Sequence, residues 1–192
     1  MNNEEFLKAI KAMSFDDYWE KVVASGWLDW IPKSEVLEMK TKVGEEFNER
    51  PQYAYTFLSR YIIVHDSGPE EMTPYIEDLS RISNGQFNPT NIIENDEQGK
   101  QILKFEFNHK VYSIDNIPFD ENEHGTHKWE VRLINHALED NKIECRFIQL
   151  PYCDEEFPYI FLPPRTYKKA QDLGVMPPND EYFTYLMEND ET

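Results

Sequence analysis

Apolar residues recur every three or four positions through the first 86 residues of the chain, a period typical of amphipathic helices. The best-marked stretch is residues 15–25, whose apolar side chains fall on one helical face. Ser14 precedes it, with Asp17 three positions later, as in an N-terminal capping box. Gly26 stands where a left-handed residue ends a helix. The pattern therefore predicts a helix between Ser14 and Gly26.

Three more helices are predicted in this region. One begins after Pro32, with Ser34 as its N-cap. Pro51 either breaks this helix or begins the following one at a position where proline is permitted. The next covers residues 53–66, although the four residues YIIV at positions 61–64 suit a strand equally well. The third ends at Gly85, a typical helix stop.

After Phe87 the period changes from helical to strand-like, with apolar and polar residues alternating. Residues 102–115 predict a β-hairpin around a two-residue turn at Asn108 and His109. This turn fixes the register: Phe107 pairs with Lys110, Phe105 with Tyr112 and Leu103 with Ile114. The same register places Leu103, Phe105, Tyr112 and Ile114 on one face, so the turn and the alternation agree.

The remaining elements continue in strand–strand–helix order. A helix is expected over residues 126–140, strands over 142–150 and 157–163, and a helix over 164–175. Both strands are too apolar to have one wet face, so we expect them at the centre of one antiparallel sheet. The order suggests a repeated ββα unit, and residues 179–189 suggest a last helix.

Helices followed by strands indicate an α+β fold: an N-terminal helical layer, then an antiparallel sheet with two or three helices. We expect a helical region at residues 1–86 and an α+β region at 87–192, packed together as one globular unit. A length of 192 residues is sufficient to bury a core without disulfides or metals.

Net charge excludes one class of partner and favours another. The chain has 37 acidic and 19 basic residues, a net charge of −18. Nucleic-acid affinity comes from cationic side chains that displace counterions, so we expect no nucleic-acid partner. A basic protein would be attracted to such a surface. The alternative is that the acidity serves solubility alone.

Compartment is inferred from the two cysteines and from hydropathy. The chain begins with an acidic stretch and has no apolar run of membrane-spanning length, so a cytoplasmic location without membrane contact is expected. Cys145 alternates with apolar residues and is expected to be buried. Cys153 lies among carboxylates, which raise a thiol pKa and lower its reactivity.

Residues 119–136 hold three of the five histidines beside several carboxylates. A calcium loop fits Asp120, Asn122 and Gly125, but it places His124 at a ligand position and Val131 where a bidentate glutamate belongs. A zinc site would use His124 and His127 with Glu123 or Cys153 as further ligands.

A helix start explains this stretch more fully. Thr126 then acts as N-cap, with carboxylates near the positive end of the helix dipole. His127 and His136 are nine residues apart and point to opposite faces, so they cannot act on one substrate. No phosphate loop, nucleophile elbow or metalloprotease motif is found. We therefore expect no catalytic residue, metal ligand or cofactor.

Acidic loops between the later elements are the candidate binding surface, with aromatic side chains beside them as anchors. Its residues are Asp120, Glu121, Glu123, Tyr152, Asp154, Glu155, Glu156 and Phe157. Tyr159 is a further candidate anchor, and the segment ENDE (94–97) a further acidic loop.

These observations favour a non-catalytic acidic module that binds a basic protein. Bacterial immunity proteins, the antidotes of secreted toxins, have the same general character, but no shared motif supports the comparison. The alternative is a small metal-dependent hydrolase that uses His124, His127 and nearby carboxylates. A structural subunit of a larger assembly is a third hypothesis, and the pattern leaves the oligomeric state open.

Overall fold

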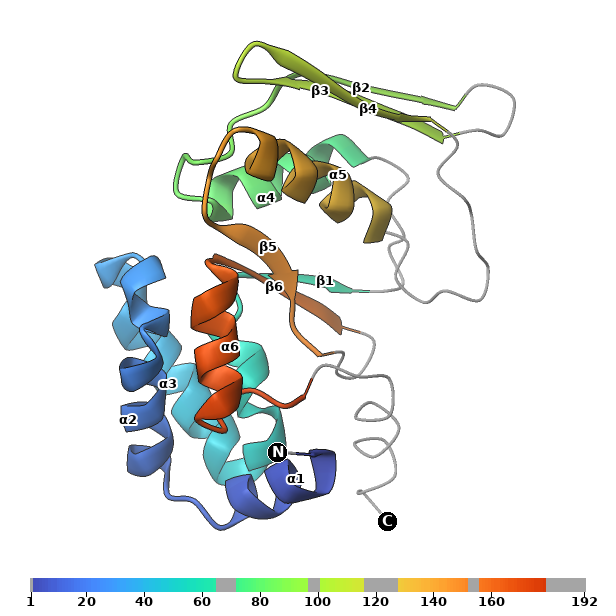
Figure 1. Ribbon diagram of the computed structural model, residues 1–192. Coiled ribbons are helices and arrows are strands. Elements are labelled where there is room, and N and C mark those ends of the chain that lie inside the picture. The colour runs from blue at the N-terminus through green and yellow to red at the C-terminus, as the bar shows by residue number, and fades with distance from the viewer. Residues whose placement is uncertain (1, 65–71, 97–100, 116–127, 152–155, 179–192) are drawn as a thin grey trace. The chain divides into compact units, whose positions relative to one another are not determined.

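The computed structural model describes residues 2–64, 72–96, 101–115, 128–151 and 156–178 (Figure 1). The chain divides into two compact units. Unit 1 comprises Met1–Ile63 and Ile148–Thr192, and unit 2 is Val64–Phe147. Position 87, the predicted start of the α+β region, lies within unit 2.

The fold is α+β, as predicted. The helices are α1 (Asn3–Lys11), α2 (Phe15–Ser25), α3 (Lys33–Glu49), α4 (Met72–Ile82), α5 (Lys128–Asp140) and α6 (Pro164–Asp172), with 3₁₀ helices η1 (Trp27–Trp30) and η2 (Pro51–Leu58). Strands β1 (Tyr61–Val64), β5 (Arg146–Gln149) and β6 (Glu156–Leu162) form one sheet in the order β1-β6-β5. Strands β2 (Thr90–Asp96), β3 (Gln101–Phe107) and β4 (Lys110–Asp115) form a second, in the order β2-β3-β4. Within the described ranges, no helix combines the length and apolarity that crossing a membrane requires.

Helix α2 begins and ends where the sequence predicts. The Ser14 hydroxyl accepts a hydrogen bond from the Asp17 backbone N–H at 3.1 Å and donates to its carboxylate at 2.6 Å. Gly26 ends the helix with φ of +82°, which L side chains rarely adopt.

Ser34, by contrast, is not the cap of α3. The helix begins at Lys33, and the Pro32 carbonyl already accepts the first hydrogen bond, from the Glu35 N–H at 2.8 Å. Ser34 therefore lies inside the first turn, and the predicted N-cap is wrong by two positions.

Of the two interpretations of YIIV within residues 53–66, the strand is confirmed, and the helix is wrong over residues 59–64. The chain forms the 3₁₀ helix η2 up to Leu58 and then enters strand β1 at Tyr61. Backbone pairing explains the change, because the Arg60 N–H donates to the Tyr159 carbonyl at 3.0 Å and leads the chain into the sheet. The β-branched and aromatic residues of YIIV suit that sheet.

Unit 1 has an aromatic-rich core in which two large aromatic side chains donate hydrogen bonds to backbone carbonyls. Trp27 is fully buried, and its indole Nε1–H donates to the Leu58 carbonyl at 3.1 Å. The Tyr18 hydroxyl donates to the Val175 carbonyl at 3.2 Å. At Gly44 an added Cβ would lie 3.1 Å from the Phe15 ring, so this close approach of α2 and α3 favours glycine.

The predicted hairpin is present in unit 2 with the predicted register. Phe107 pairs with Lys110, Phe105 with Tyr112 and Leu103 with Ile114. Asn108 and His109 both have positive φ, 49° and 64°, which matches a type I′ turn. Strand β2, which the sequence interpretation missed, pairs antiparallel with β3 and adds a third strand.

The predicted strand–strand–helix order occurs twice, as β3-β4-α5 and β5-β6-α6. The expectation of one sheet is wrong, because β3-β4 and β5-β6 belong to different sheets. Strand β6 is central and largely buried, as its apolar sequence predicts, but β5 is an edge strand. The last predicted helix, 179–189, lies outside the described residues.

In unit 2, α4 and α5 cover one face of the β2-β3-β4 sheet (Figure 1). Phe87 is the centre of an aromatic cluster, with its ring centroid 5.7 Å from that of Phe105, 5.2 Å from Phe107 and 5.8 Å from Phe147. Helix α5 adds Val131, Ile134, Ala137 and Leu138 to this core, so it is amphipathic, as predicted.

Replacing Ser14 with alanine is expected to lower the free energy of unfolding by about 1 kcal/mol, because an N-terminal N–H of α2 loses its side-chain acceptor. Ser34→Ala is the matched control, because it replaces a serine by alanine inside the first turn of α3, where the side chain is not the N-cap. It should change the free energy of unfolding by no more than about 0.5 kcal/mol. Urea denaturation followed by circular dichroism measures both. Equal losses for the two variants would contradict the assignment of Ser14 as the cap.

Candidate functional site

Most of the predicted binding surface lies outside the described residues. This applies to Asp120, Glu121, Glu123, Tyr152, Asp154 and Glu155. Glu156 and Phe157 begin strand β6, and only their backbone is described. The additional anchor Tyr159 is a correction: it is 2% exposed and its hydroxyl donates to Gln149 Oε1 at 3.1 Å, so it is a core residue.

Most of the candidate metal ligands cannot be placed either. His124, His127 and Cys153, and the proposed N-cap Thr126, lie outside the described residues. Within the described part of the chain, no group of three His, Cys, Asp or Glu side chains is arranged to hold a metal ion. Cys145 is buried, as predicted. His136 is exposed on α5, with its ring edge-on to that of Tyr112 at 6.3 Å between centroids.

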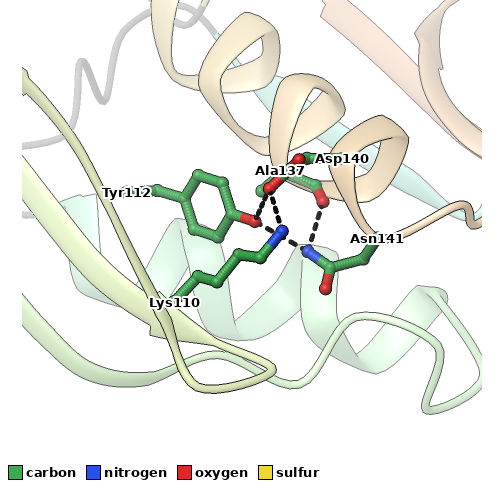
Figure 2. A network of polar contacts seen from close by, with 5 residues as sticks. All are labelled: Lys110, Tyr112, Ala137, Asp140 and Asn141. Carbon is green, nitrogen blue, oxygen red and sulfur yellow. Dashed lines mark hydrogen bonds and ion pairs between the residues drawn. The ribbon is translucent and has the colours of Figure 1, made fainter.

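A polar network joins the C-terminal end of α5 to the hairpin (Figure 2). Asp140 Oδ2 receives hydrogen bonds from Lys110 Nζ and from the Tyr112 hydroxyl, each at 2.7 Å. Asn141 Nδ2 donates to the Tyr112 oxygen at 2.7 Å and to the Ala137 carbonyl at 2.8 Å. The phenol of Tyr112 thus donates once and accepts once, and the helix end is held at two points on β4.

The charges in this network stabilise one another. The hydrogen bond from Lys110 lowers the pKa of Asp140, with a further contribution from Tyr112. The bond with Asp140 raises the pKa of Lys110. Burial raises the pKa of Tyr112, and the Asp140 carboxylate raises it further. All three groups therefore keep one ionisation state around neutral pH, which indicates a structural anchor rather than an acid–base centre.

Glu130 lies near the other end of α5, ten residues from Asp140 and therefore about 15 Å along the helix axis. Its side chain is fully buried. Neither Oε1 nor Oε2 has a hydrogen-bond partner of acceptable geometry among the described residues. A buried carboxylate is normally paired or hydrogen-bonded, so this residue is unusual.

A second carboxylate faces Glu130 from the sheet. Glu94 on β2 is directly opposite Leu103 on β3, and Leu103 points into the core. Directly opposite residues share a face, so Glu94 also points to the side that the helices cover. The expectation of an acidic loop at 94–97 is thus wrong for Glu94–Asp96, because these residues belong to β2.

Burial determines the ionisation of Glu130. Desolvation, with a smaller contribution from the Glu94 carboxylate, raises its pKa from 4.5 to about 7. Its backbone N–H acts in the opposite direction, as does the positive end of the helix dipole, because Glu130 is in the first turn of α5. Desolvation is the larger effect, so near pH 7 this carboxyl is divided between its protonated and ionised forms.

Sequence reasoning missed both carboxylates of this pair. A signal was present for Glu130, which precedes Ile134 by four positions and Ala137 by seven and so belongs to the buried face of the helix. No comparable signal marks Glu94, because it stands beside asparagine and aspartate in a stretch typical of a loop.

No family model, no curated protein and no solved structure matches the chain. What the fold and the site define is an α+β protein whose helix α5 has a polar network at one end and, near the other, the buried Glu130 carboxyl opposite the half-buried Glu94. Full burial of Glu130 separates it from any substrate in this conformation, so the pair is not an exposed acid–base centre.

Tyr112→Phe is expected to lower the free energy of unfolding by about 1–2 kcal/mol, because Asp140 and Asn141 each lose a hydrogen bond. Tyr167→Phe is the matched control, since Tyr167 is similarly buried but its hydroxyl has no hydrogen-bond partner in the described structure. That change should be neutral or slightly stabilising. Urea denaturation of both variants provides the comparison, and equal losses would argue against a stabilising role of the network.

Glu130→Gln is expected to change the pH dependence of stability. The folded state of the wild type binds the Glu130 proton more tightly than the unfolded state, so stability is greatest below about pH 4.5 and decreases as the pH rises through about 7. The shift corresponds to about 3 kcal/mol at most. Glutamine resembles the protonated form, so the variant should match the wild type at low pH and exceed it above pH 7.

Glu139→Gln serves as the control for this experiment, because Glu139 is an exposed carboxylate of the same helix. Thermal denaturation from about pH 5 to about pH 8.5 should give parallel curves for Glu139→Gln and the wild type. If Glu130→Gln is less stable than the wild type at every pH, the carboxyl has a hydrogen-bond role that the structure does not describe.

Proposed function

We propose that the protein binds a basic protein and performs no chemistry of its own. The observation that supports this is the surplus of 18 negative charges. It extends over both units: unit 1 has 20 acidic and 11 basic residues, and unit 2 has 17 and 8, so each has a net charge of −9. A field of one sign on each unit attracts a cationic partner from a distance and speeds association.

Local ion pairs engage many of the basic side chains in the described ranges. The pairs are Lys42–Glu38, Arg50–Glu46, Arg60–Glu35, Arg81–Asp78, Lys110–Asp140 and Lys168–Asp172. Each pair is nearly neutral at a distance, so the remaining carboxylates determine the long-range field. This supports attraction of a cationic partner and disfavours a phosphate backbone.

The finer proposal concerns the docking face and the kind of partner. Asp120, Glu121 and Glu123, together with Asp154, Glu155 and Glu156, provide the charge, and Tyr152 and Phe157 provide aromatic anchors. This assignment rests on the sequence pattern. The partner is a basic enzyme that the protein inhibits, in the manner of a bacterial immunity protein and its toxin. Carboxylates would act mainly on the association rate, and buried aromatic anchors on the dissociation rate.

The test begins with immobilised full-length protein and a cell lysate at low and high salt, followed by kinetics with the purified captured partner. Neutralising Asp120, Glu121 and Glu123 with their amide analogues should slow association by about tenfold at low salt. The charge-matched control neutralises three exposed helical acids, Glu20, Glu45 and Glu49, and should slow it by no more than about threefold. Tyr152→Ala should instead increase the dissociation rate.

Two outcomes would count against the proposal. Association that does not change between about 50 and 500 mM salt would exclude steering by the acidic surface. Equal effects of the two triple variants would exclude the specified docking face while leaving general electrostatic attraction in place.

A further inference from the structure

The turn that follows helix α4 in unit 2 contains the chain's single Asn-Gly pair, Asn84–Gly85. Both residues are exposed, and neither belongs to a helix or a strand. Both have positive φ, 54° and 79°, as is typical of the left-handed residues that follow a helix. Glycine and asparagine adopt this conformation at the least cost, so the pair suits the turn.

The same pair can react with itself, because the backbone nitrogen after an asparagine can attack the side-chain amide carbon and close a five-membered ring. Among the described residues, no hydrogen-bond acceptor engages the Gly85 N–H. A side chain at position 85 would hinder the attack, and glycine has none. The place that a Cβ would take is open, with no atom within 4 Å apart from those of Gly85 and its chain neighbours. The attacking nitrogen is therefore accessible to the Asn84 side chain and to solvent.

We propose that Asn84–Gly85 is a self-modification site, at which Asn84 of the folded protein deamidates to aspartate and isoaspartate. Hydroxide takes the proton of the Gly85 N–H, and the nitrogen forms a bond to Asn84 Cγ. The Cγ–Nδ2 bond then breaks, Nδ2 takes a proton from water, and ammonia leaves a succinimide ring. Water opens this ring at Cγ to give aspartate, or at the main-chain carbonyl to give isoaspartate. The net reaction consumes water and releases ammonia, and it is independent of the proposed partner.

Isoaspartate at position 84 would alter a closed loop that holds Phe87. The Phe87 N–H donates to Ser83 Oγ at 3.0 Å, and the Phe87 carbonyl accepts from Ser80 Oγ at 2.8 Å and from Ser83 Oγ at 3.1 Å. An isoaspartyl link adds a methylene to the main chain between Ser83 and Phe87, so the loop needs a new path between the same anchor points. Phe87 is the centre of the aromatic cluster of unit 2, so this change reaches the core.

Incubation of the full-length protein at about pH 7.5 and about pH 9, followed by peptide mapping with mass spectrometry, tests the site. Asn108 is the internal control: it is exposed in a turn and has positive φ, but histidine follows it. Deamidation should be at least about tenfold faster at Asn84 than at Asn108, because the His109 Cβ hinders the attack. The rate at Asn84 should also rise with pH, since hydroxide takes the proton. Equal rates at the two positions would overturn the proposal, as would a reaction at Asn84 that occurs only in urea-unfolded protein.

The effect on Phe87 is measured separately. Anion exchange isolates the modified protein, because both products carry an additional negative charge, and peptide mapping gives its isoaspartate content. Asn84→Asp is the matched control, since it has the same charge with an ordinary main chain. The modified protein should unfold at a lower urea concentration than Asn84→Asp, by an amount that grows with its isoaspartate content. Equal midpoints would show that the loop accommodates the added methylene and would overturn the effect on the core.

Discussion

Burial of α5 against the β2-β3-β4 sheet is the interaction on which unit 2 depends. The side chains of Val131, Ile134 and Leu138 are fully or almost fully buried. Burial of each such side chain contributes about 1.5–3 kcal/mol to the free energy of unfolding. The sum of these three contributions exceeds the roughly 3 kcal/mol by which ionisation of Glu130 destabilises the folded state. The sheet face can therefore tolerate one unpaired carboxyl.

The two ends of α5 illustrate two ways in which polar groups are accommodated at the same interface. Near the surface, Asp140 accepts two hydrogen bonds, one of them from a cation, so ionisation stabilises the contact. Deeper in the layer, Glu130 has the same kind of carboxyl without such donors in the described structure, so ionisation weakens the contact. The surroundings, not the residue type, determine whether a carboxylate stabilises or loosens this helix.

Local signals in the sequence were sufficient where turn chemistry and periodicity agreed. The hairpin register followed from the turn at Asn108 and His109 together with alternation, and α2 followed from Ser14 and Gly26. Tertiary pairing decides what the pattern left open or missed: YIIV, which suited a helix or a strand, is a strand because it joins β6, and Glu94 lies in a strand because β3 pairs with it. The candidate site was least predictable, since the pairing of Glu130 with Glu94 depends on a sheet that the sequence pattern did not reveal.

Surplus charge and the buried Glu130 carboxyl are connected through thermodynamic linkage. A net charge of −9 on unit 2 makes the potential around Glu130 and Glu94 more negative, which favours the bound proton. A basic partner bound to this unit would make that potential less negative and lower the affinity for the proton. Proton release on binding would follow, and by reciprocity a higher pH would strengthen binding.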